Sequence, residues 1–305
     1  MNRLSHKSIH LNYWSEILRP PLIAEGLIDF ERYLLNSSLD SLAYDMKNRD
    51  AWDQRHNTIN LKILTILTAC RAYHDQRKHL LNETTLSNET KQAVEIEFRN
   101  AFDSSFEYRL METLRNYAQH RKLPLAGVTE SNKNEWADES TAPNGPSRLR
   151  FTLNPYFSRK ALLKERKAMR SATMDDLEKI EQEQLDVKYL LRKYVSDLSN
   201  CHFSFRELSQ NVVAESHKQL LHASAFLAEA KKSNDGTPPR HITLSHRYNQ
   251  VTDNTYADIE LSERLTNSRK SWGNLKYFMR MYYSSQLVAD KNRHFGEGHT
   301  IWIPS

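Results

Sequence analysis

The stretch INLKILTILTACRAY, residues 59 to 73, decides the fold, because it contains the longest apolar run in the chain. Apolar residues step along it by three and four positions, a spacing that places them on one side of an α-helix. They are Ile59, Ile63, Ile66, Cys70 and Tyr73, and Leu64 and Leu67 widen the stripe. We therefore predict a helix from Ala51 to about Leu81 that is the central, most buried element of the molecule.

Weaker helical patterns extend on both sides of this segment. A first helix is expected from Asp29 to about Lys47, and a third begins near Thr90, after Ser87 or Asn88 as its N-cap. Asp103, Ser104 and Ser105 then offer a kink or a new cap. Further helices are expected at residues 106–120, 156–172, 174–198, 205–232 and around 271–289.

Composition agrees with a mostly helical protein. The 305 residues include 7 glycines and 9 prolines, too few for a fold rich in turns. We predict an all-α bundle of about five to six helices. A small β-hairpin insertion is expected at residues 123–129 and 148–153, which alternate apolar and polar side chains around a loop rich in turn formers. The segment SNDGTPPR, 233–240, reads as a linker, so residues 1–235 form the expected bundle domain and 236–305 a C-terminal extension of unknown role.

Charge, cysteine content and hydropathy set the broad class. The formal net charge is +5, a mild basic excess compatible with a phosphate-bearing partner. The two cysteines match no metal-ligand spacing and lie in apolar helical patterns, which favours two buried thiols in a reducing compartment. No apolar run approaches the length of a membrane span. We therefore expect a cytoplasmic protein with no membrane contact.

Most familiar enzyme signatures are missing from the sequence. It has no G-x-x-x-x-G-K-[ST] loop, no G-x-G-x-x-G, no H-E-x-x-H, no C-x-x-C and no G-x-S-x-G. His217 and His222 are five positions apart, about 140° around a helix, so they do not form a natural metal-binding pair. We expect neither a metal nor a cofactor.

The segment LRNYAQHRKLP, residues 114–124, is the candidate site. On a helical wheel Phe106, Leu110, Leu114 and Tyr117 occupy one side, while Arg115, Gln119, Asn116 and His120 fill the opposite arc. An arginine can bind phosphoryl oxygens bidentately, and a histidine can move a proton to or from a ribose hydroxyl or a leaving oxygen. Together with two amides, these groups could hold and cleave a phosphodiester without a metal.

These residues carry a resemblance to a known family. Arg115, the adjacent Asn116 and His120, late in a helix of a small bundle, resemble the R-x(4 to 6)-H motif of the HEPN superfamily. Other loosely spaced Arg/His pairs occur in the chain, but only this one has a four-residue gap, an Asn after the Arg and a preceding amphipathic helix. The resemblance covers residues 27–230, and sharply only the six from Arg115 to His120.

The resemblance implies a function and an assembly. Active members are metal-independent endoribonucleases, mostly homodimeric, whose composite site joins two copies of the motif across the interface. They occur in toxin–antitoxin, CRISPR-associated and other defence systems, so RNA, a second copy of the chain and an antitoxin or defence-system protein are the implied partners. Arg115, Asn116 and His120 would be the catalytic set.

Neighbouring polar residues extend the candidate site, and other interpretations stay open. Substrate-binding residues would be Gln119, Arg121 and Lys122, together with Arg71 and His74 on the central helix. The same features also fit a solvated helix face with a capping histidine, or a HEPN-like fold without catalysis. The alternative function is thus a non-catalytic helical scaffold that binds RNA or protein.

Overall fold

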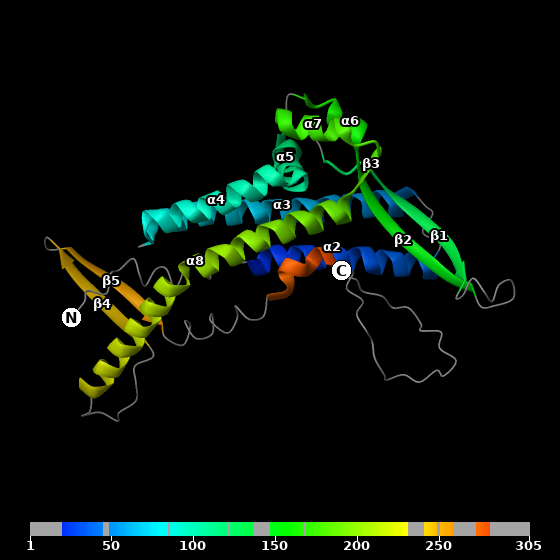
Figure 1. The fold of residues 1–305 in the computed structure, drawn as a ribbon. Coiled ribbons are helices and arrows are strands. Elements are labelled where there is room, and N and C mark those ends of the chain that lie inside the picture. The colour runs from blue at the N-terminus through cyan, green and yellow to red at the C-terminus, as the bar shows by residue number, and fades with distance from the viewer. Residues whose placement is uncertain are drawn as a thin grey trace. The chain divides into compact units, whose positions relative to one another are not determined.

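The protein is mostly helical, as the sequence predicts (Figure 1). The computed structural model describes residues 20–44, 49–84, 86–120, 123–136, 147–166, 169–230, 241–248, 251–258 and 273–280. Within these ranges five helices have fifteen residues or more: α2 (Pro20–Ala43), α3 (Arg49–Glu83), α4 (Asn88–Ser104), α5 (Phe106–His120) and α8 (Val187–Ala230). Two are short: α6 (Arg159–Leu163) and α7 (Ser171–Lys179).

Helix α3 carries the predicted apolar core. Its buried side chains include all five that define the opening pattern, Ile59, Ile63, Ile66, Cys70 and Tyr73. Helix α2 lies close to it, because the Cβ of any residue replacing Gly26 would lie 3.3 Å from Cγ1 of Ile66. The start of α2 at Pro20 is nine residues earlier than predicted. The helical spacing of apolar residues is not visible at the Pro20–Pro21 pair. Proline is nevertheless well suited to the first turn of a helix, so the pair is compatible with this early start.

Serine caps set two helix starts as the sequence indicates. The side chain of Ser87 accepts a hydrogen bond from the Thr90 amide at 3.2 Å, at the start of α4. Ser105 accepts from the Tyr108 amide at 3.2 Å and separates α4 from α5. Each hydroxyl satisfies an amide that has no partner inside its own helix.

The predicted hairpin is present, but its first strand covers 127–136 instead of 123–129 and so extends into the expected loop, while its second strand is longer than predicted. Strands β1 (Gly127–Trp136) and β2 (Ser147–Ser158) pair antiparallel, from Gly127 opposite Tyr156 to Trp136 opposite Ser147. Strand β3 (Gln184–Asp186) adds to the other edge of β2. The predicted helix at 156–172 is therefore wrong over its first three residues, which complete β2, and the helical part is short. Phe157 is fully buried in the sheet, and strand pairing prevails over the local apolar spacing there.

The helices predicted at 174–198 and 205–232 are also redistributed. Residues 171–179 form α7, β3 follows, and α8 then runs without a break for 44 residues, as Figure 1 shows. The polar segment SNCHFS, 199–204, does not end the helix, because its own residues Ser199, Cys201 and His202 are buried against neighbouring elements. The acidic residues 175, 176 and 178 lie in the middle and end of α7 instead of opening a long helix.

The C-terminal part contains a hairpin that the sequence does not reveal. Strands β4 (His241–Tyr248) and β5 (Val251–Asp258) pair antiparallel. Of the helix expected around 271–289, the structure describes Gly273–Arg280, which form a 3-10 helix, η2; the remaining positions lie outside the described residues. The expected linker at 233–240 and the final segment HTIWIPS lie outside the described residues. The boundary at residue 235 stays a prediction.

The chain forms two compact units, and each is described here by itself. The first contains residues 1–23, 69–104 and 197–275; the second contains 24–68, 105–196 and 276–305. In the first unit the buried Tyr73 hydroxyl lies 3.0 Å from Nδ1 of the buried His202. Both cysteines are buried free thiols, as predicted, and burial raises the pKa of Cys201 to about 12, so this thiol stays protonated at neutral pH.

Candidate functional site

Helix α5 positions the candidate site in the second unit. It ends at His120, and three of its predicted core residues, Leu110, Leu114 and Tyr117, are buried. Phe106, the fourth, is half-buried. The predicted inward face of this helix is therefore largely confirmed.

The helix is more enclosed than the wheel suggests. Tyr108, Met111 and Thr113 are buried as well, so apolar contact covers more than one side. Among the α5 side chains that the structure describes, Asn116 alone is exposed. The polar residues in the first half of α5, which the predicted polar face does not include, are contacted by side chains from α7 and α8.

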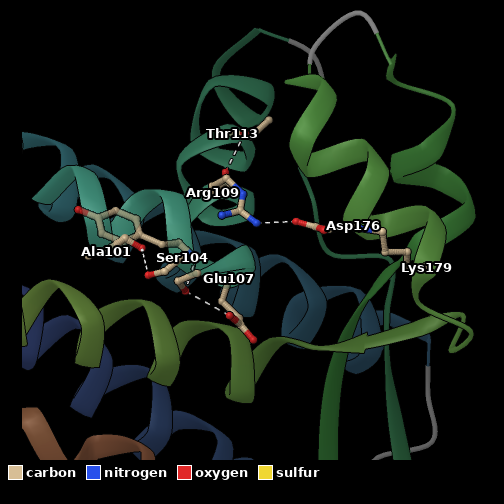
Figure 2. A network of polar contacts seen from close by, with 9 residues as sticks. Ala101, Ser104, Glu107, Arg109, Thr113, Asp176 and Lys179 are labelled. Atoms are coloured by element: carbon tan, nitrogen blue, oxygen red, sulfur yellow. Dashed lines mark hydrogen bonds and ion pairs between the residues drawn. The ribbon is translucent and has the colours of Figure 1, made fainter.

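Those contacts form a network, and Figure 2 shows the part of it that lies between α4, α5 and α7. Arg109 donates to Asp176 of α7 at 2.5 Å. Glu107 accepts from the Ser105 hydroxyl at 3.2 Å and from the Tyr189 hydroxyl of α8 at 3.1 Å. Tyr194 of α8, which is buried, donates to Glu112. The polar residues in the first half of α5 therefore fasten this helix to its neighbours.

The charge state of Asp176 follows from these contacts. Partial burial pushes the pKa of this carboxyl upward, but hydrogen bonds and positive charge from Arg109 and Lys179 outweigh burial and hold the pKa below its ordinary value of 3.8. Asp176 is therefore ionised at neutral pH and forms a charged ion pair with Arg109.

Arg115 and Asn116 have a different environment. Arg115 is half-buried, and its Nη1 donates to Oδ1 of Asn116 at 3.0 Å. Its Nε is buried and has no hydrogen-bond partner among the described residues. The guanidinium is thus held on one side by a neutral amide, with no carboxylate of the described chain paired to it. Such a group retains donors for an anion.

The remaining predicted residues are only partly placed. For Gln119 and His120 the structure gives the helical backbone and no side-chain position, and Arg121 and Lys122 lie outside the described residues. Whether these four converge with Arg115 stays a prediction.

Arg71 and His74 belong to the first unit, while Arg115 and Asn116 belong to the second. Arg71 binds Asp75 through two contacts of 3.0 Å, and His74 meets the ring of Phe98 edge-on at 6.0 Å between centroids. Their expected role in substrate binding stays a prediction.

The sequence patterns do not identify Asn60 and His56, which contact the segment that follows α5. Oδ1 of Asn60 in α3 accepts a hydrogen bond from the Leu125 amide at 3.2 Å, and Nε2 of His56 lies 3.2 Å from the Leu125 carbonyl oxygen. Asn60 is fully buried. The sequence does contain one signal for this contact, because Asn60 directly follows Ile59 inside the apolar stripe of the central helix. An amide that is buried there requires a hydrogen-bond partner, so its position predicts a contact with another part of the chain.

Comparisons with protein-family models, with curated proteins and with solved structures find no match to this chain. Within the described ranges, no three or more His, Cys, Asp or Glu side chains group in a way that could hold a metal ion. No described helix is both long enough and apolar enough to cross a bilayer.

Proposed function

We propose that the protein is a metal-independent endoribonuclease of HEPN type, acting through Arg115, Asn116 and His120. The observation that supports this proposal is the state of Arg115. Its guanidinium donates to the Asn116 amide and is not paired with a described carboxylate. An arginine positioned but not neutralised by its own protein is suited to a phosphodiester.

The proposed chemistry uses the substrate's own hydroxyl. A histidine removes the proton of the ribose 2′-hydroxyl, its oxygen attacks the adjacent phosphorus, and the bond from phosphorus to the 5′-oxygen breaks. The leaving oxygen takes up a proton, so the products carry a 2′,3′-cyclic phosphate and a 5′-hydroxyl. Arg115 would stabilise the charge that develops on the phosphoryl oxygens, and Asn116 would orient Arg115.

A homodimer completes the proposal. One protomer supplies one His120, whereas the reaction is helped by one group that removes a proton and another that donates one. A two-fold axis brings the same surface of two copies together and would supply both. The two Arg115 charges would then repel, and bound phosphate would offset the repulsion. Light scattering over a concentration series in low salt tests this: a monomer throughout, with RNA present, would exclude the composite site.

RNA cleavage in EDTA by purified variants tests the activity. His120→Ala is expected to lower the rate by about 10²- to 10⁴-fold. Two substitutions of exposed residues of the same types, Arg99→Ala in α4 and His79→Ala in α3, serve as matched controls and should leave the rate unchanged. Intact RNA with wild type, or equal rates for wild type and His120→Ala, would remove this function.

A second candidate function, a non-catalytic interaction scaffold, is favoured by a different surface. On α2 the large apolar residues Ile28, Leu35, Leu39 and Leu42 are exposed and recur at spacings of seven, four and three along one side. Such a row is suited to helix–helix association. A scaffold that binds through this row predicts that Leu39→Asp weakens partner binding while His120→Gln has little effect, whereas the nuclease requires His120.

A further inference from the structure

The chain leaving α5 is held at both backbone groups of one residue. Leu125 is five positions after His120, is buried, and follows the buried Pro124. Its N–H donates to Oδ1 of Asn60 at 3.2 Å, and its carbonyl oxygen accepts from Nε2 of His56 at 3.2 Å. Two side chains from one turn of α3 thus fix a single residue of the segment that follows the candidate site.

The two side chains also fix each other. Nδ2 of Asn60 lies 3.4 Å from Nδ1 of His56 and donates to the His56 carbonyl oxygen at 3.2 Å. Because a carbonyl oxygen only accepts, Nε2 of His56 carries the proton, which leaves Nδ1 to accept from the amide. Trp52 stacks on the imidazole, with 5.1 Å between ring centroids. Both ring nitrogens are therefore engaged, so His56 is not free to transfer protons to a substrate.

The following residues are fixed from the opposite direction. Ala126 donates to the Tyr156 carbonyl oxygen of β2 at 3.0 Å. At Gly127 an added Cβ would lie 2.7 Å from the Tyr156 hydroxyl oxygen, so any larger residue here would displace the Tyr156 side chain. Residues 124–127 are consequently held between α3 and β2.

We propose that Asn60 and His56 are positioning residues for the site on α5. They fix the exit of the helix, and the last turn of α5 reaches the fixed Leu125 through only four intervening residues, 121 to 124. A displacement of about 1 Å in a catalytic group lowers rates about 100-fold, so a site at a helix end needs that end to be fixed. This inference rests on the proposed ribonuclease function for its effect on catalysis, while the clamp itself is measurable without RNA.

The first arm of the test measures the clamp. Asn60→Leu places an apolar side chain of similar size at this position of the α3 stripe and leaves the Leu125 amide without its acceptor. Hydrogen–deuterium exchange of wild type and variant should show faster exchange in peptides covering 117–126 and no change in α3 beyond the turn that contains position 60. Thr65→Ala, which removes only a local bond to the Leu61 carbonyl on the same helix, is the control and should change neither. Unchanged exchange at 117–126 would overturn the proposal, whatever the activity.

The second arm measures catalysis. Asn60→Leu and His56→Leu should lower kcat for RNA cleavage by about 10- to 100-fold with KM little changed, because the phosphate contacts remain while their alignment is lost. His56→Gln should restore kcat, since its amide can donate to the Leu125 carbonyl oxygen as Nε2 does. If exchange increases but kcat does not fall, the two residues are purely structural and the positioning role is wrong. An inactive wild type would refute the ribonuclease and leave the clamp to be decided by exchange alone.

Discussion

Two arginines six positions apart on α5 have opposite surroundings. Arg109 is nearly buried and donates to the carboxylate of Asp176, whereas Arg115 is half-buried, donates to the neutral Asn116 and forms no ion pair with a described carboxylate. An arginine neutralised by a carboxylate from another helix contributes to the fold. An arginine without a carboxylate partner adds less to the free energy of unfolding and is the better candidate for binding an anion.

Of the two arginines, Arg115 should have the larger effect on cleavage when it is replaced. Arg115→Ala is expected to lower the rate of RNA cleavage by about 10²- to 10³-fold, since the developing charge loses its main cation. The free energy of unfolding should change by less than about 1 kcal/mol, because no ion pair with a described carboxylate is broken. Single-turnover cleavage and urea unfolding on the same preparation measure both. A large loss of stability would remove the distinction between the two arginines.

Arg109→Ala should show the reverse pattern. Removing this guanidinium leaves Asp176 partly buried without its main partner, which should lower the free energy of unfolding by about 2 kcal/mol. Cleavage per folded molecule should be little affected. Lys179→Ala is the matched control, because Lys179 contacts the same carboxylate at 3.2 Å but is exposed, so its loss should cost less than about 1 kcal/mol in urea unfolding.

Asn116→Ala tests whether Asn116 orients Arg115. The single hydrogen bond of 3.0 Å to Arg115 is lost, which should lower the cleavage rate about fivefold, in line with about 1 kcal/mol for one such bond. Asn116→Asp would pair the arginine with a carboxylate and should reduce RNA affinity more than Asn116→Ala does. Tighter RNA binding by the Asp variant, measured by fluorescence anisotropy, would contradict this role.

The smallest expected effect is a pH dependence of stability. The pKa of Asp176 is lower in the folded protein than its ordinary value of 3.8, so its contribution is complete above that value and is lost as the pH falls through the folded-state pKa. The difference in unfolding free energy between wild type and Asp176→Asn should therefore be constant near neutral pH and should shrink as the pH falls below 3.8. A difference that grows on acidification would mean that the carboxylate is destabilised in the fold.

Local signals predict part of this molecule well. The range of α5 follows from a capping serine at 105 and a proline at 124, and the core of α3 follows from helical spacing. By contrast, α8 continues through the polar segment 199–204 because side chains in it are buried by distant parts of the chain, and Phe157 belongs to a strand because Leu185 of β3 pairs with it. Neither partner is visible in a local window.

The site divides in the same way. Arg115 and Asn116 are adjacent, so a helical wheel can group them. Asn60 and Leu125 are 65 positions apart, and the sequence around either residue does not predict that the two are hydrogen-bonded. The close fit of Gly127 against Tyr156 is equally a product of strand register. Sequence patterns therefore identify groups that share one helix, and long-range positioning requires the folded chain.

The most direct test of the central claim is cleavage of one RNA oligonucleotide and its fully 2′-O-methylated counterpart in EDTA, by wild type and by His120→Ala. The account predicts that wild type cleaves only the unmodified RNA and leaves 5′-hydroxyl ends, while His120→Ala leaves both intact. Cleavage of the methylated strand, 5′-phosphate ends, or equal products from wild type and variant would contradict it, because each excludes a 2′-hydroxyl attack assisted by His120.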